Sequence, residues 1–291
     1  MSRPAILCIS LSHLVSDSRV LRQIGLLAEF GDVTTIGFGP RPPGASEHIE
    51  VPSGLKTLPQ TPKGVLDLGL RRFRATELAA PAVAWSLAAL DGRMFDLVVA
   101  NEARVLALAD RVAKGAPVWA DMHEWAPEER THILSWRLLV APLMRYLCRR
   151  YLPRAAVVTT VAGSIGELYE RDFGVSPIVM RNAGRWRDLS PRPVQDGAIR
   201  LVHSGVAVHG RRLELMIDAM SQLDERYSLD LYLLPAGDGG AYLDTLKQRA
   251  GGDPRVTFRP GVPPEDLPST LNAYDVGVFW IPPSHMNARL T

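Results

Sequence analysis

Two arginines and two glycines form the first group of residues whose types and spacing could do chemistry. The segment HSGVAVHGRRLELMIDAM contains Gly205 and Gly210, followed by Arg211 and Arg212 in the first turn of a predicted helix. Cationic side chains at that end of a helix oppose its dipole, which favours negative charge. A bound phosphate removes the conflict, because free N–H groups and guanidinium groups would both face an anion. The alternative is two solvated arginines at a helix start.

Three further segments place candidate groups after predicted strands, where the ligands of open parallel sheets bind. In ADMHEWAPEE, His123 and Glu124 bring an imidazole and a carboxyl group to a strand end, although a lone histidine is more often structural. In LLPAGDGGAYL, Gly237 begins a glycine-rich turn that either lets a ligand approach or only bends the chain. In VFWIPP, Trp280 either flanks a planar base or packs in the core.

Motifs of several other enzyme classes are absent from the sequence. It has no DxD triplet, HExxH, GxSxG or complete P-loop, and the segment after the first predicted strand, SLSHLVSDSRV, has no GxGxxG. These absences disfavour a Mg-carboxylate sugar-transfer site, a zincin, an α/β-hydrolase and hydride transfer to NAD. We therefore expect neither a metal nor a bound cofactor.

Strand-like apolar runs alternate with helical patterns in two blocks. The predicted strands are Ala5–Ser10, Val33–Phe38, Asp96–Ala100, Pro117–Asp121, Ala156–Thr160 and Pro177–Met180, then Ile199–His203, Leu229–Leu234, Arg255–Phe258 and Val276–Trp280. The predicted helices are Ser18–Phe30, a zone over 64–90, Ala103–Ala113, Ser135–Tyr151 and Ser164–Phe173, then Arg211–Leu223, Tyr242–Ala250 and Pro264–Ala273. Apolar strands separated by helices indicate parallel sheets covered on both faces.

The segment Arg185–Ala198 interrupts this alternation with prolines, a glycine and mixed charge, which is typical of a linker. We predict an α/β protein with two Rossmann-like, doubly wound parallel-sheet domains, residues 1–184 and 199–291. The linker 185–198 joins them, and the second domain is expected to be incomplete. A length of 291 residues agrees with two domains.

Composition narrows the function and the compartment. Lys and Arg total 33 against 31 Asp and Glu, a balance that argues against a nucleic-acid binder. Two cysteines without a CxxC pair predict neither a disulfide framework nor a zinc site. The N-terminus lacks a signal-peptide core, and the longest apolar run, Leu78–Leu90, is shorter than the roughly 20 residues of a spanning helix. We expect a cytoplasmic protein.

Arginines gather on two of the predicted helical stretches of the first block. They are Arg71, Arg72, Arg74, Arg137, Arg145, Arg149, Arg150 and Arg154. Apolar and aromatic residues lie between them, Trp136 and Tyr146 among these, so the stretches are basic and amphipathic. This pattern suits peripheral contact with an anionic membrane, for example the inner face of the plasma membrane. An ordinary solvated surface is the alternative.

Taken together, these segments resemble a family-4-type glycosyltransferase of the GT-B fold over nearly the whole chain. SDSRVLRQIGLLAEFGDVTTIGF resembles the family's first helix and second strand, and DMHEW its strand-end histidine motif. FGVSPIVMRNAG is similar to the segment that enters the linker, and HSGVAVHGRRLELMIDAM to the donor-phosphate loop. VTFRPGVPPEDLPSTLNAYDVGVF resembles the run before the last catalytic motif.

The resemblance implies transfer of a sugar from a nucleoside diphosphate sugar to a polysaccharide or glycolipid-type acceptor, with retention and without a metal. Arg211, assisted by Arg212, would stabilise the leaving diphosphate, and Gly205 would let the donor approach the backbone. His123 would lie near the transferred sugar. The implied donor-binding residues are Gly205, Arg211, Arg212, Gly237 and Trp280. The implied cleft residues are Asn182 and Glu124.

The chain departs from the family pattern in two places. Val206 stands where the family often has an arginine, and the sequence stops at Thr291, before a Glu-x7-Glu motif that contacts donor sugar and ribose. We therefore expect a truncated enzyme, with a catalytically silent nucleotide-sugar-binding remnant as one alternative. A sugar-nucleotide epimerase is another, with Glu124, Glu128 and Glu129 as its carboxylates.

Overall fold

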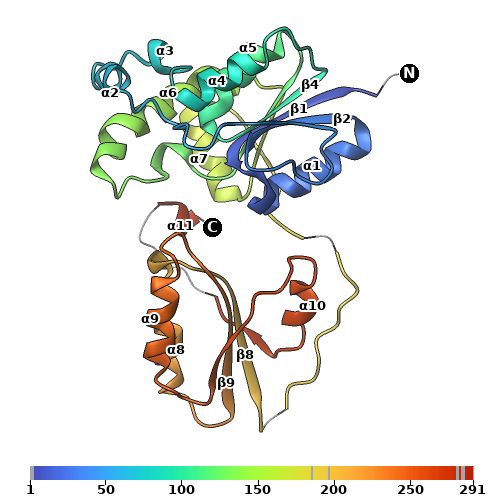
Figure 1. Cartoon of the computed structure of the whole chain (residues 1–291), viewed down its shortest axis with the longest axis vertical. Helices are drawn as coiled ribbons and strands as arrows, with labels where there is room; N and C mark the ends of the chain where they lie inside the picture. Colours follow the sequence, from blue (N-terminus) through green and yellow to red (C-terminus); the bar gives the residue numbers. More distant parts are fainter. Residues whose placement is uncertain (1–2, 185, 196, 280–281, 283–285, 291) are drawn as a thin grey trace. The chain divides into compact units, whose positions relative to one another are not determined.

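The computed structural model describes residues 3–184, 186–195, 197–279, 282 and 286–290, and the chain divides into two compact units (Figure 1). Unit 1 comprises residues 1–183 and 284–291, and unit 2 comprises residues 184–283. The last helix, α11 (Met286–Leu290), therefore groups with unit 1, whereas the boundaries predicted from the sequence assign it to the second domain.

Unit 1 is built on a seven-stranded sheet in the order β3-β2-β1-β4-β5-β6-β7, and all its strands run parallel. The strands are β1 (Ala5–His13), β2 (Asp32–Phe38), β3 (Glu47–Glu50), β4 (Leu97–Asn101), β5 (Val118–Met122), β6 (Val157–Thr160) and β7 (Ile178–Val179). The order reverses between β1 and β4, because the chain adds strands outward in one direction from β1 and in the other from β4. Such a switch point opens a crevice at the carboxyl ends of the two strands.

Helices cover both faces of this sheet. They are α1 (Ser18–Phe30), α2 (Pro62–Gly69), α3 (Phe73–Thr76), α4 (Pro81–Ala89), α5 (Leu106–Ala113), α6 (Ala141–Tyr151) and α7 (Gly163–Phe173), with a π-helical turn (Trp136–Val140) before α6. Side chains alternate along β1, so Ile6 and Cys8 pack in a cluster with α1, while Leu7 and Ile9 pack in the larger cluster on the other face. The predicted coverage of both faces is confirmed for this unit.

Unit 2 holds a parallel four-stranded sheet in the order β10-β9-β8-β11, with its own switch point between β8 and β11. Its strands are β8 (Ile199–Ala207), β9 (Tyr227–Pro235), β10 (Val256–Arg259) and β11 (Val276–Gly277). Its helices are α8 (Glu214–Met220), α9 (Ala241–Ala250) and α10 (Leu267–Leu271). A separate core, with Leu231 and Leu246 fully buried, joins α8 and α9 to the sheet. The prediction of two parallel-sheet α/β domains is confirmed.

Two local predictions around the candidate donor loop are wrong. β8 runs on to Ala207, so Gly205 lies inside the strand and not in a loop after it. The predicted helix from Arg211 starts only at Glu214, because a 3-10 turn (His209–Arg211) and a left-handed Arg212 with φ +50° precede it. No helix among the described residues has the length and apolar character required to cross a bilayer.

Candidate functional site

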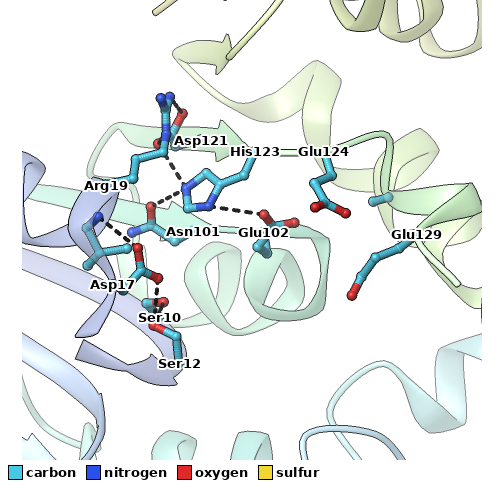
Figure 2. Close-up of polar contacts among 12 residues, drawn as sticks. Ser10, Ser12, Asp17, Arg19, Asn101, Glu102, Asp121, His123, Glu124 and Glu129 are labelled. Carbon is cyan, nitrogen blue, oxygen red and sulfur yellow. Dashed lines mark hydrogen bonds and ion pairs between the residues drawn. The ribbon is translucent and has the colours of Figure 1, made fainter. Parts of the chain in front are cut away.

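A cavity of about 220 Å³ opens at the switch point of unit 1, at the carboxyl ends of β1, β4 and β5 (Figure 2). The residues that line it are Ser10, Leu11, Ser12, Asp17, Asn101, Glu102, Arg104, Val105, His123, Glu124 and Glu129. Most of them carry hydroxyl, amide, carboxyl or guanidinium groups. A ligand rich in hydroxyl groups matches this lining, because each of its hydroxyls can both donate and accept a hydrogen bond.

His123 is the centre of the polar contacts in this cavity (Figure 2). Its Nε2 atom lies 3.1 Å from Asn101 Oδ1 and 3.2 Å from Asp121 Oδ2, and its Nδ1 atom lies 3.2 Å from Glu102 Oε1. Because all three neighbours are acceptors, the doubly protonated imidazolium satisfies them best. Burial of the ring lowers the pKa of His123, but the hydrogen bond to Asp121 and the charges of Glu102 and Asp121 outweigh it, so the pKa is raised.

Asp121 is a fully buried anchor that orients this histidine. Arg19 of α1 binds its carboxylate through two nitrogens, with Nε 2.8 Å from Oδ2 and Nη2 2.6 Å from Oδ1. Thr159 donates a further hydrogen bond of 2.5 Å. Burial alone would raise the pKa of Asp121, but the hydrogen bonds from His123 and Arg19 lower it to about 2. A carboxylate with so many donors is held as an anion and does not act as a base.

The carboxyl group of Glu102 differs from that of Asp121, because its pKa is raised and not lowered. It follows β4 with a backbone conformation of φ +77° and ψ 156°, which residues other than glycine rarely adopt. Burial raises the pKa of its carboxyl group to about 7, against the opposing charge of His123. Strained backbone and a near-neutral carboxyl pKa in one cavity-lining residue are typical of a functional position.

Two more carboxyl groups complete the cavity on the side of the segment after β5. Glu129 accepts hydrogen bonds of 2.5 Å at both oxygens from Arg104, whose guanidinium also lies over the ring of Trp136. Glu124 accepts a hydrogen bond of 3.0 Å from Asn287 of α11, and burial raises its pKa. The described residues contain no group of His, Cys, Asp or Glu side chains arranged to hold a metal ion.

The predicted donor residues of unit 2 lie partly together. A Cβ atom at Gly205 would lie only 3.0 Å from Arg211 Nη1 and 3.6 Å from His203 Nε2, so the missing side chain leaves room for the Arg211 guanidinium. The Arg211 backbone N–H donates to the Val208 carbonyl oxygen, but its guanidinium has no hydrogen-bond or ion-pair partner among the described residues. Arg212 forms an ion pair of 3.6 Å with Glu214.

Gly237, another predicted donor residue, belongs to the glycine-rich segment that follows β9. Positive φ angles at Gly239 and Gly240 build the turn after β9, and Asp238 accepts hydrogen bonds from the backbone of Gly240 and Tyr242 at the start of α9. Gly237 is not among the positive-φ glycines, and no atom lies within 4 Å of the position that its Cβ would take. The tight-turn interpretation therefore fits Gly239 and Gly240. Trp280 lies outside the described residues. Asn182, in unit 1, accepts a hydrogen bond from Arg22 of α1.

Sequence reasoning found His123 and Glu124 but missed their partners. Asn101 and Glu102 directly follow the predicted strand Asp96–Ala100, and residues at the carboxyl end of a strand are candidates for ligand binding. Arg19 gave no such signal, because its contact with Asp121 spans 102 positions in the sequence. His203 was also missed. Its buried Nε2 has no hydrogen-bond partner in the part of the chain that the structure describes.

No protein-family model matches this chain, and no curated protein matches its sequence. Several solved structures share its fold. HepE (Alr3699) from Anabaena, in complex with UDP and glucose, aligns with a TM-score of 0.64 and 17% identity over 96% of this chain and 74% of HepE. A UDP-forming α,α-trehalose-phosphate synthase from Burkholderia vietnamiensis gives 0.56 with 12% identity over 96% of this chain and 78% of its own.

A glycosyltransferase from Rickettsia africae gives a TM-score of 0.54 with 11% identity, over 95% of this chain and 72% of its own. At these identities the likeness establishes the architecture, which is the GT-B type with two parallel-sheet units. The predicted fold class is confirmed in this respect.

Proposed function

We propose that this protein is a glycosyltransferase that moves a sugar from a nucleoside diphosphate sugar to a hydroxyl group of a polysaccharide or glycolipid-type acceptor. The observation that carries the proposal is the Arg211 guanidinium, which lies beside Gly205 near the switch point of unit 2 without a partner among the described residues. A cation held in this way favours a bound anion. The complexes of HepE with UDP and with UDP-glucose support a uridine diphosphate donor as the first choice for testing.

The chemistry assigned to Arg211 is electrostatic. When the bond between the sugar carbon and the diphosphate oxygen breaks, negative charge develops on the leaving diphosphate, and a positioned guanidinium stabilises that charge. In this proposal Arg211 does the work that a metal ion does in other sugar transferases, and the reaction proceeds with retention. In this proposal Gly205 lets the phosphates approach the backbone. A side chain there would also have to displace the Arg211 guanidinium, whose Nη1 atom would lie 3.0 Å from its Cβ.

The cavity of unit 1 is assigned to sugar hydroxyl groups. Asp121 and Glu102 hold His123 in this cavity, and both N–H groups of its protonated ring face protein acceptors. In this proposal one N–H exchanges its contact with Glu102 for an oxygen of the transferred sugar. Asn101 and Ser10 add further hydrogen-bonding groups in the same cavity. Glu124, a predicted cleft residue, lines this cavity. Asn182, the other predicted cleft residue, accepts a hydrogen bond from Arg22 of α1.

The donor assignment is tested by titration calorimetry with UDP and GDP, comparing the wild type with Arg211→Ala. We expect a loss of about tenfold or more in affinity, because hydrogen bonds to charged groups are the strong ones. Arg226→Ala is the matched control, since Arg226 pairs with Asp224 just before β9 and therefore lies at the amino-terminal edge of the sheet. Equal losses in both variants, or no binding of either nucleotide, would contradict the donor site.

A sugar-nucleotide epimerase is the second candidate, and the pKa of about 7 at Glu102 favours it, because acid–base catalysis needs groups that titrate near neutral pH. Of the three carboxylates predicted for this reaction, Glu124 and Glu129 line the cavity, whereas Glu128 pairs with Arg145 and does not. Incubation with a UDP-sugar and no acceptor separates the two activities, since only an epimerase then converts the sugar while leaving it on the nucleotide.

A further inference from the structure

Unit 1 exposes apolar side chains on two neighbouring helical segments. Its members are Val65, Leu66, Leu70, Ile133, Leu134 and Leu138, here called the apolar patch. The side chains of Leu66 and Leu134 are 60% and 59% exposed, and apolar side chains that gather on a surface mark interaction sites. α2 packs against the π-helical turn that precedes α6, so the two segments lie side by side (Figure 1).

The spacing of these residues along each helical segment places their side chains on one solvent-exposed face. Leu66 and Leu70 are four positions apart on α2 and its C-cap, and Leu134 and Leu138 are four apart in the segment before α6, so each pair shares a helix face. α2 already buries Leu68 on its inner side. Arg71 joins the two segments, because its Nη1 atom donates a hydrogen bond of 2.7 Å to the Leu138 carbonyl oxygen.

Exposed charges around the apolar patch are positive. They belong to Lys63, Arg71, Arg72, Arg74 and Arg137. The acidic group within α2 is Asp67, whose side chain is only 5% exposed and is bound by Lys63 and Arg72. This side of unit 1 therefore presents leucines surrounded by cations.

The remaining arginines of the basic set predicted from the sequence are placed differently. Arg145 of α6 pairs with Glu128 and Asp172, Arg150 pairs with Glu77 and Arg154 pairs with Asp110. Arg149 is exposed beside them. Acidic neighbours therefore offset the charge of this part of the surface. The arginines predicted as one basic set therefore lie on two parts of the surface. The part around the apolar patch carries exposed cations, of which Lys63 and Arg72 pair with the buried Asp67.

We propose that the apolar patch docks this protein on an anionic lipid bilayer, with its leucines inserted among the acyl chains and the flanking cations at the headgroups. Leucine side chains gain free energy on leaving water, and arginine and lysine gain electrostatic attraction at an anionic surface. Long cationic side chains can also keep their charges at the headgroups while their stems cover apolar surface. The proposal stands on this surface alone and does not depend on the glycosyltransferase assignment.

The test is co-sedimentation of the full chain with two kinds of vesicle, one of phosphatidylcholine alone and one in which about a third of the lipid is anionic phosphatidylglycerol. We expect binding to the anionic vesicles, weak binding to pure phosphatidylcholine, and weakening as salt rises. The double variant Leu66→Ser/Leu134→Ser is expected to lower the partition coefficient by about tenfold or more. Phe30→Ser is the matched control, because Phe30 is 67% exposed on α1, on another part of unit 1.

Several outcomes would overturn the proposal. These are no binding to anionic vesicles, equal binding to both compositions, and unchanged binding of the leucine double variant. An equal loss in Phe30→Ser would also count against it. Self-association that the leucine substitutions abolish, measured by light scattering without lipid, would assign the patch to a second copy of the chain. Circular dichroism checks that each variant is folded, which the exposure of the substituted side chains favours.

Discussion

Glu102 and Asp121 show how one imidazole can be held between two carboxyl groups of opposite character. Both lie within 3.2 Å of the His123 ring, yet the pKa of Asp121 is lowered to about 2 and that of Glu102 is raised to about 7. Arg19 and Thr159 donate hydrogen bonds to Asp121 and not to Glu102. These donors therefore help to lower the pKa of Asp121 but leave that of Glu102 unchanged. Titratable groups whose pKa values are separated in this way divide the structural and chemical roles between them.

The backbone of Glu102 supplies the first prediction at this scale. Because φ +77° with ψ 156° suits glycine, Glu102→Gly should be more stable than Glu102→Ala by about 1 kcal/mol, the reverse of the usual order of these two residues. Both variants remove the carboxyl group, so their difference isolates the backbone. Urea unfolding at neutral pH measures it. An alanine variant as stable as the glycine variant would show that the backbone at this position is not strained.

Some helices and strands were predicted from the sequence and others were not, and in each case nearby residues explain the outcome. Helix Ser18–Phe30 was predicted with its exact ends, because Asp17 caps it through the Val20 amide and Gly31 follows it. β3 (Glu47–Glu50) was missed, because a short polar edge strand lacks the apolar run that signals a buried one. Arg212 was predicted to be helical, since nothing in the sequence announced its left-handed backbone.

A second difference between sequence and structure concerns the candidate site itself. Strand ends can be predicted from apolar runs, and so His123 and Glu124 were found. The hydrogen bonds that orient His123 join β4, β5 and α1, and pairing across such distances depends on the order of strands in the sheet. A single sequence shows where strands lie along the chain but not which strands are neighbours in the sheet. Asn101 and Arg19 were therefore not identified as partners of His123 and Asp121.

At the scale of elements, two glycines predict opposite effects of the same substitution. A Cβ atom at Gly37 of β2 would lie 2.4 Å from the Ser10 carbonyl oxygen, which is backbone and cannot rotate away, so Gly37→Ala should cost about 2–3 kcal/mol. Gly25→Ala in α1 meets nothing within 4 Å and should stabilise by about 0.5–1 kcal/mol. Urea unfolding of both variants tests the pair. If Gly37→Ala left the free energy of unfolding unchanged, β1 and β2 would be able to move apart at little cost.

At the scale of the whole chain, the two units repeat one design. Each has a parallel sheet whose order reverses beside its first strand, and the candidate residues lie near the carboxyl ends of the strands at that point. The chain passes from unit 1 through unit 2 and returns, because residues 284–291 group with unit 1. Composition and periodicity could predict the repeated design, but not this return, which depends on contacts between positions more than 160 residues apart.

Asn287 provides the last prediction, because it ties α11 to the segment after β5. Its side-chain oxygen accepts a hydrogen bond of 2.7 Å from the buried Trp125 amide, and its nitrogen donates to Glu124. Asn287→Ala removes that acceptor, so we expect a loss of about 1–3 kcal/mol in unfolding free energy and faster hydrogen exchange at the Trp125 amide. Asn272→Ala is the control, since its exposed bond to the Ser190 carbonyl should be worth less than about 0.5 kcal/mol. Unchanged exchange at Trp125 in Asn287→Ala would mean that α11 does not hold this segment, and the grouping of the last residues with unit 1 would lose its physical basis.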